Sequence, residues 1–165
     1  MKSTRTKGSG DFDLSKALKS LQDKVAKVGW VKKTTYPDAM DQTTAQSAIE
    51  AEFGVPIRNV PPRPIIRPAI IENEMKWRRI AEKEAKKVFQ GKQTGIQLMA
   101  MIGVEAANDI KDNIKSLESP PLSPTTIERR RQIRSGKGDV GLLTKPLIDT
   151  GLMLETCTHI VEIKK

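Results

Sequence analysis

The chain has 165 residues, of which 29 are lysine or arginine and 20 are aspartate or glutamate, giving a formal net charge of +9. Its length suits one domain, and its positive charge favours contact with a polyanion or an acidic protein surface. A single cysteine, Cys157, and a single histidine, His159, exclude an internal disulfide and a zinc site that needs about four such ligands. Without a long apolar run we expect a protein made in the cytosol, with no membrane contact and no cofactor.

The amino-terminal part predicts a tail, a helix, a strand and a second helix. Residues 1–12 are basic and rich in Ser, Thr and Gly, which is typical of a mobile tail. Apolar residues then recur at helical spacing over 14–25, and β-branched residues over 27–35 predict a strand. A Thr-x-x-Gln capping box opens the next helix, which ends at Gly54.

The proline-rich arm, residues 55–68, is the most unusual stretch. Five prolines fall within thirteen residues, and each fixes φ near about −65° and removes a backbone donor, so we predict a stiff extended segment with a short edge strand at 64–67. Two interpretations stay open: a rigid connector packed on its own domain, or an arm that grips a neighbouring subunit. On the second interpretation, a variant in which both Arg63 and Arg67 are replaced by alanine is expected to stay folded but not to assemble. The residues assigned to this interface are Pro61, Pro62, Arg63, Pro64, Ile65, Arg67 and Pro68.

Two long amphipathic patterns, at about 70–90 and 95–117, predict an antiparallel helical hairpin. Small residues on the second helix, including Gly103 and Ala106, let another element approach closely. We expect a neighbouring element to pack against these small residues, and the arm of an adjacent subunit is one candidate.

The carboxy-terminal part predicts a short arginine-rich helix, a flexible loop at 135–145 and a strand at 156–163, with Cys157 and His159 on one face. We expect this strand to pair antiparallel with the one at 27–35. The fold class is then α+β: a small antiparallel sheet packed on the helical hairpin, in a single domain at 13–165.

No arrangement of residues predicts catalysis, so we expect the protein not to be an enzyme. No serine lies in a G-x-S-x-G elbow, and RSGKGDVG does not match a Walker A loop. Nucleic-acid binding is the alternative function, because four arginines lie close together on the short helix and are candidate polyanion contacts. They are Arg129, Arg130, Arg131 and Arg134.

Four motifs taken in order resemble a known family. The tripeptide EFG (52–54) precedes the PPRP and RP arm (61–68), the run PPLSPTTIERR (120–130) follows the long helices, and KPLIDTGLM (145–153) comes last. Together they resemble the minor structural proteins of tailed bacteriophages in the tail-completion, neck, head–tail joining and virion-morphogenesis group. The similarity covers roughly Val28 to the end. Members usually carry a large aromatic residue where this chain has Ile65 and Ile66.

The resemblance implies a structural virion protein, assembled in the host cytoplasm and located in the neck or tail of the particle. It implies a homo-oligomeric ring, a hexamer, between the capsid connector and the tail. The expected partners are neighbouring neck, connector and tail-tube or tail-terminator proteins, with DNA in the channel as a further candidate. The motifs do not separate tail completion, tail termination and head–tail joining.

Overall fold

The computed structural model describes residues 14–36, 41–133 and 143–164, so the predicted tail at 1–12 and most of the predicted loop at 135–145 lie outside the described residues. Within these ranges the fold is α+β, with six α-helices, one short 3₁₀ helix and a two-stranded antiparallel sheet. The elements in chain order are α1 (Leu14–Gln22), β1 (Lys24–Gly29), α2 (Thr44–Phe53), η1 (Pro56–Arg58), α3 (Ile66–Phe89), α4 (Gly95–Ser116), α5 (Pro124–Ile133), α6 (Leu152–Thr156) and β2 (Thr158–Ile163).

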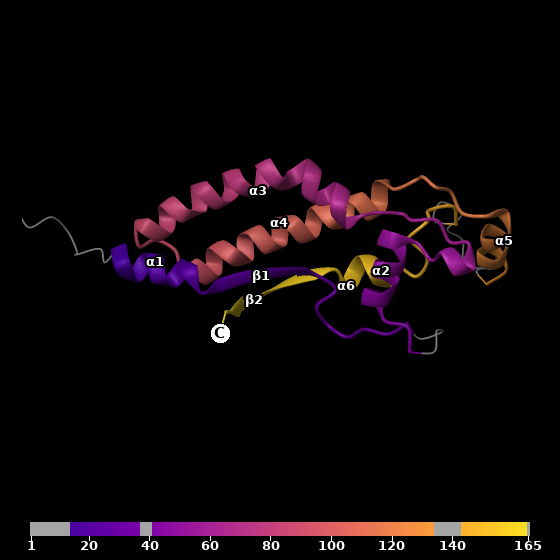
Figure 1. The fold of residues 1–165 in the computed structure, drawn as a ribbon, viewed down its shortest axis with the longest axis horizontal. Helices are drawn as coiled ribbons and strands as arrows, with labels where there is room; N and C mark the ends of the chain where they lie inside the picture. Colours follow the sequence, from indigo (N-terminus) through magenta and orange to yellow (C-terminus); the bar gives the residue numbers. More distant parts are fainter. Residues whose placement is uncertain (1–13, 37–40, 134–142, 165) are drawn as a thin grey trace, which may run out of the picture.

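The predicted hairpin is present, and helix α4 lies at the centre of the molecule. It packs against α3 on one side and against the β1–β2 ribbon on the other, while α1 lies at one end and α5 at the opposite end (Figure 1). Asp109 of α4 joins the two long helices, since its carboxylate accepts Trp77 Nε1 at 2.7 Å and Lys76 Nζ at 2.6 Å.

The two predicted strands do pair, with β1 shifted towards the amino terminus. Lys24 pairs with Ile163 and Gly29 with Thr158, so the first strand covers 24–29 instead of 27–35. The chain leaves the ribbon after Gly29, whose φ is 130°, and Trp30 then turns to donate its indole N–H to the Met153 carbonyl at 2.8 Å.

The close-approach role predicted for Gly103 is confirmed, with β2 as the neighbour. A Cβ at Gly103 would lie 2.6 Å from His159 Cδ2, so only glycine allows α4 to approach the ribbon this closely. Cys157 is fully buried, with its Sγ 3.9 Å from the Ala107 carbonyl oxygen. Cys157 and His159 therefore face α4 together, as alternation predicts. Because β2 covers Gly103, this face is closed to a neighbour's arm.

The start of α3 differs from the sequence prediction. Residues 66 and 67 are helical, so the predicted edge strand at 64–67 is wrong. Pro68 is the third residue of the helix, where its missing N–H is one that a first turn leaves without an intrahelical partner anyway. The preceding residue, Ile65, is fully buried in the main core. That core also contains Ala48, Ala69, Ile110, Ile114, Ile148, Met153 and Cys157.

Candidate assembly interface

The first half of the arm, residues 55–60, folds into a tight loop. Val55 and Val60 exchange two backbone hydrogen bonds of 2.9 and 3.1 Å across the 3₁₀ turn. Gly54 makes this loop possible, because its φ is 73° and a Cβ there would lie 2.8 Å from Pro62 N. Ile57 lies within the 3₁₀ turn and is 93% exposed. The loop therefore holds an apolar side chain out in solvent on a hydrogen-bonded support.

The second half of the arm is fastened to its own domain by Arg63. The residue is 8% exposed, and its guanidinium donates from Nε to the Pro120 carbonyl at 2.8 Å and from Nη2 to the Pro121 carbonyl at 2.9 Å. Its backbone N–H donates to the Ala51 carbonyl. Burial lowers the pKa of Arg63, but an arginine starts so high that it keeps its charge. One side chain thus joins the arm to the SPPLSP segment more than fifty residues away.

Glu52 secures the end of the arm and the start of α3. Its carboxylate accepts the backbone N–H groups of Ile65 at 2.7 Å, Ile66 at 2.9 Å and Arg67 at 3.2 Å, together with Arg67 Nε at 2.7 Å. This charged group satisfies donors that the first turn of a helix leaves open, and its negative charge suits the positive end of the helix dipole. Burial alone would raise the pKa of Glu52, but the hydrogen bonds from Arg67 and these amides outweigh it and lower the pKa.

Sequence reasoning did not assign Glu52 a role, although it stands in the EFG motif. The available signal was one acidic residue directly before a basic, proline-rich stretch. From this signal Glu52 can be selected, but its partners cannot be identified. They lie thirteen to fifteen residues further along the chain and contact Glu52 only in the folded subunit.

The seven predicted interface residues differ in burial and in the contacts they make within the subunit. Arg63 and Ile65 are buried in the subunit itself, and Arg67 is bound to Glu52 and lies over the Phe53 ring at 5.2 Å. Prolines 61 and 62 are exposed, while Pro64 and Pro68 are half-buried. The contacts of Arg63 and Ile65 are those of a connector packed on its own domain. Contact of the seven residues with a neighbouring chain stays a prediction.

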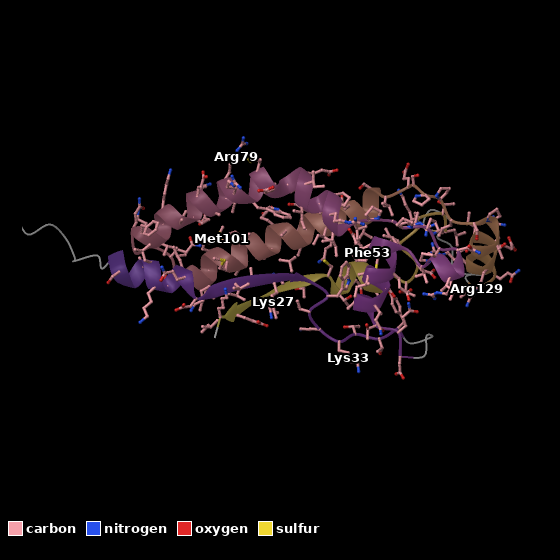
Figure 2. All side chains as sticks on the ribbon, in the orientation of Figure 1. Lys27, Lys33, Phe53, Arg79, Met101 and Arg129 are labelled. Atoms are coloured by element: carbon pink, nitrogen blue, oxygen red, sulfur yellow. The ribbon has the colours of Figure 1, made fainter. Side chains whose placement is uncertain are left out.

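Three exposed apolar residues of α2 and the 3₁₀ turn that follows it are a second candidate for contact with a partner, and we call them the α2 surface: Ile49, Phe53 and Ile57. Phe53 is 64% exposed and lies where α2 approaches the long helices (Figure 2). Arg58 binds Glu50 at 2.6 Å and borders a polar hollow that is also lined by Asp41, Gln42 and Gln46. Exposed apolar groups on a fixed support, with a charged rim, are typical of protein contacts.

The arginine-rich helix α5 uses one of its predicted polyanion contacts internally. Arg130 is buried, and its Nη1 donates to the Lys145 carbonyl at 2.7 Å and the Ile148 carbonyl at 3.4 Å, while its Nη2 donates to the Pro146 carbonyl at 3.3 Å. Arg131 is exposed and bound to Glu128 at 2.7 Å. Arg129 is exposed at the α5 end of the molecule (Figure 2). Arg134 lies outside the described residues.

The last part of the predicted loop at 135–145 also packs. Leu143 is buried, and Lys145 Nζ lies 3.1 Å from Glu118 Oε1. Arg130 therefore fixes a segment for which the sequence predicts flexibility.

The described residues hold no group of three or more His, Cys, Asp or Glu side chains placed to bind a metal ion. Burial raises the pKa of the Cys157 thiol to about 11, which makes it a poor nucleophile near neutral pH. None of the described helices combines the length and apolar character needed to cross a bilayer.

Comparison of the chain with protein-family models, with curated proteins and with solved structures finds no match.

Proposed function

We propose that this chain is a structural virion protein of a tailed bacteriophage that forms a ring at the head–tail neck and completes the tail or joins it to the capsid connector. The observation that supports this most is that the four motifs of the resemblance contact one another. Glu52 of EFG binds the backbone of residues 65–67 at the end of the arm. Arg63 of the arm binds the carbonyls of Pro120 and Pro121, and Arg130 binds carbonyls of the KPLI segment.

These contacts give the four motifs a shared structural role, which is to hold separate segments of the chain in fixed positions. Buried charged groups are costly unless they are fully paired, so side chains such as Glu52, Arg63 and Arg130 are placed where segments must be held in fixed positions. The segments that they hold form the end of the molecule that carries α2, α5 and α6 (Figure 1). A rigid end with the exposed α2 surface on it suits a protein that works by docking to neighbours.

DNA or RNA binding through α5 is the weaker candidate. A phosphate contact needs a free guanidinium at the surface, whereas Arg130 is buried on backbone carbonyls and Arg131 is paired with Glu128. Titration with duplex DNA at two salt concentrations separates the two functions. Duplex affinity that falls steeply as salt rises would favour phosphate binding through α5, and little or no duplex affinity at either salt concentration would favour the neck function.

The proposal is tested in a phage that encodes this chain. Deletion of the gene is expected to leave filled heads and free tails unjoined in electron micrographs, and the wild-type chain supplied in trans is expected to restore joined particles. Normal yields of infectious particles from the deletion would contradict the proposal.

The contribution of the α2 surface is tested by complementation with Ile57→Asp. Because Ile57 is almost fully exposed, this variant is expected to fold normally by circular dichroism and still fail to restore joining. The matched control Ile57→Val keeps the apolar surface and is expected to restore it. Full complementation by Ile57→Asp would remove the α2 surface from the account.

A further inference from the structure

Among the described residues, no hydrogen bond outside the ladder reaches the outward backbone groups along the two edges of the β1–β2 ribbon. Lys164 N–H donates to the Asp23 carbonyl at 2.7 Å, so these opposite residues form a hydrogen-bonded pair. In an antiparallel ladder such pairs alternate with pairs whose N–H and C=O groups point away from the partner strand. The register therefore turns a second set of residues outward: Lys24, Ala26 and Val28 on β1, and His159, Val161 and Ile163 on β2.

No described helix other than α4 packs substantially on this ribbon, and α4 packs on both strands, as a helix does when it lies across one face. Figure 1 shows α4 alongside the ribbon. Neither strand contains a proline, and the register runs through six pairs without a bulge. Proline, bulges, covering loops and charged side chains are the usual means by which proteins block an edge, and of these the two strands carry only charges: Lys24 and Lys27 on β1 and Glu162 on β2. As far as the described residues go, both edges therefore remain open to another strand whose charges complement these.

We propose that copies of this chain join edge to edge, with β1 of one copy pairing antiparallel with β2 of the next. Charge selects this pairing: β1 carries Lys24 and Lys27, whereas β2 carries Glu162, which already binds Lys27 within the subunit. Pairing β1 with a second β1 would place lysines near lysines, which destabilises a sheet. The inference rests on the proposed function, because it names the contact between copies in the ring.

The helical layer is compatible with this repeat. Neighbouring strands lie about 4.8 Å apart, so each two-stranded copy advances the sheet by about 9.6 Å. Packed helices lie about 8–10 Å apart, so α4 of the next copy fits beside α4 of the first. Met101 and Val104 of α4 are 41% and 44% exposed, so α4 has apolar side chains that an adjacent helix would cover. A head-to-tail contact of this kind closes into a ring when the rotation between copies allows it.

Two proline variants test the proposal, each removing one outward N–H without breaking the ribbon's own ladder. Ala26→Pro blocks the β1 edge and Val161→Pro blocks the β2 edge. By sedimentation velocity the wild-type chain is expected to form oligomers, and each variant alone is expected to be monomeric. An equimolar mixture is expected to form a dimer and nothing larger, because only one β1 edge and one β2 edge remain. The matched controls, Ala26→Val and Val161→Ala, keep the N–H groups and are expected to assemble.

Dimers of Ala26→Pro alone would overturn the head-to-tail arrangement, and oligomers of both variants at wild-type size would overturn edge pairing. A wild-type chain that stays monomeric at millimolar concentration overturns it as well. If a variant does not fold, hydrogen exchange of the wild-type chain tests edge pairing instead. The backbone amides of Ala26 and Val161 are expected to become protected on assembly, and fast exchange of these amides in the oligomer would refute the contact. The presence of the chain in purified particles is measured separately, so the proposed function stands or fails by itself.

Discussion

Glu52→Gln is the substitution that tests the internal fastening most sharply. The carboxylate side chain is 4% exposed and accepts three backbone N–H groups and Arg67 Nε. Glutamine keeps the shape but has one acceptor oxygen, and its amide N–H₂ faces other donors. A hydrogen bond to a charged group contributes about 1.5–3 kcal/mol, and the Arg67 contact is discounted because that side chain is 59% exposed. The expected loss is about 3 kcal/mol of unfolding free energy.

Thermal unfolding measures this loss. For a chain of this size about 1 kcal/mol lowers Tm by roughly 2–4 °C, so Glu52→Gln is expected to lower it by about 6–12 °C. The control is Glu72→Gln, an exposed glutamate on α3, which is expected to stay within about 0.5 kcal/mol of wild type. A Glu52→Gln variant as stable as this control would refute the assigned role.

The pH dependence of the unfolding free energy is a second test of the role of Glu52. Since the pKa of Glu52 is lower in the folded chain, its stabilisation is complete above the ordinary glutamate pKa and is lost as the pH falls through the folded pKa. The stability difference between wild type and Glu52→Gln is therefore expected to be largest at neutral pH and to shrink in acid. A difference that grows in acid would contradict the sign of the shift.

Three further substitutions or measurements follow from the described contacts. Arg63→Ala is expected to cost about 3 kcal/mol in urea unfolding, and Arg63→Lys about half of that, because a lysine cannot bind both carbonyls as a planar fork; equal stability of Arg63→Ala and wild type would contradict the assignment. Gly103→Ala is expected to destabilise by about 1–2 kcal/mol despite its better helix propensity. His159→Ala in the same chain removes the imidazole ring but keeps the Cβ, which lies 2.9 Å from the added methyl group, so it is expected to recover only part of the loss, as a double-mutant cycle would measure. Cys157 is expected to resist iodoacetamide at pH 8 until the chain is unfolded in denaturant, and rapid labelling of the native chain would show that the thiol is not buried.

Local signals predict much of this fold. The capping box before the helix that ends at Gly54 forms as predicted, with reciprocal bonds of 2.8 and 3.2 Å between Thr43 and Gln46. Thr94 and Gln97 form the same box at the start of α4, with bonds of 2.9 and 3.3 Å. The side-chain alternation at the end of the chain also places Cys157 and His159 on the α4 face. Such patterns depend on residues three or four apart, or on every second residue, so they can be recognised from the sequence.

The contacts of the arm could not be predicted in the same way. Proline chemistry predicts an extended segment but not whether it docks on its own domain or on another, because the partners of Arg63 lie 57 and 58 residues away. Burial of Arg63 also changes the expectation for the Arg63 and Arg67 double alanine variant. That variant is now expected to lose stability, so it does not isolate assembly, and Ile57→Asp replaces it for that purpose.

The central claim is that this chain is a ring subunit of a phage neck, and a cryo-electron microscopy reconstruction of the neck in purified particles tests it most directly. We expect this reconstruction to show a ring of density between connector and tail that fits the α3–α4 hairpin, with Ile57 against a neighbouring polypeptide. Particles in which that region is fully explained by other chains, with no density for this one, would contradict it.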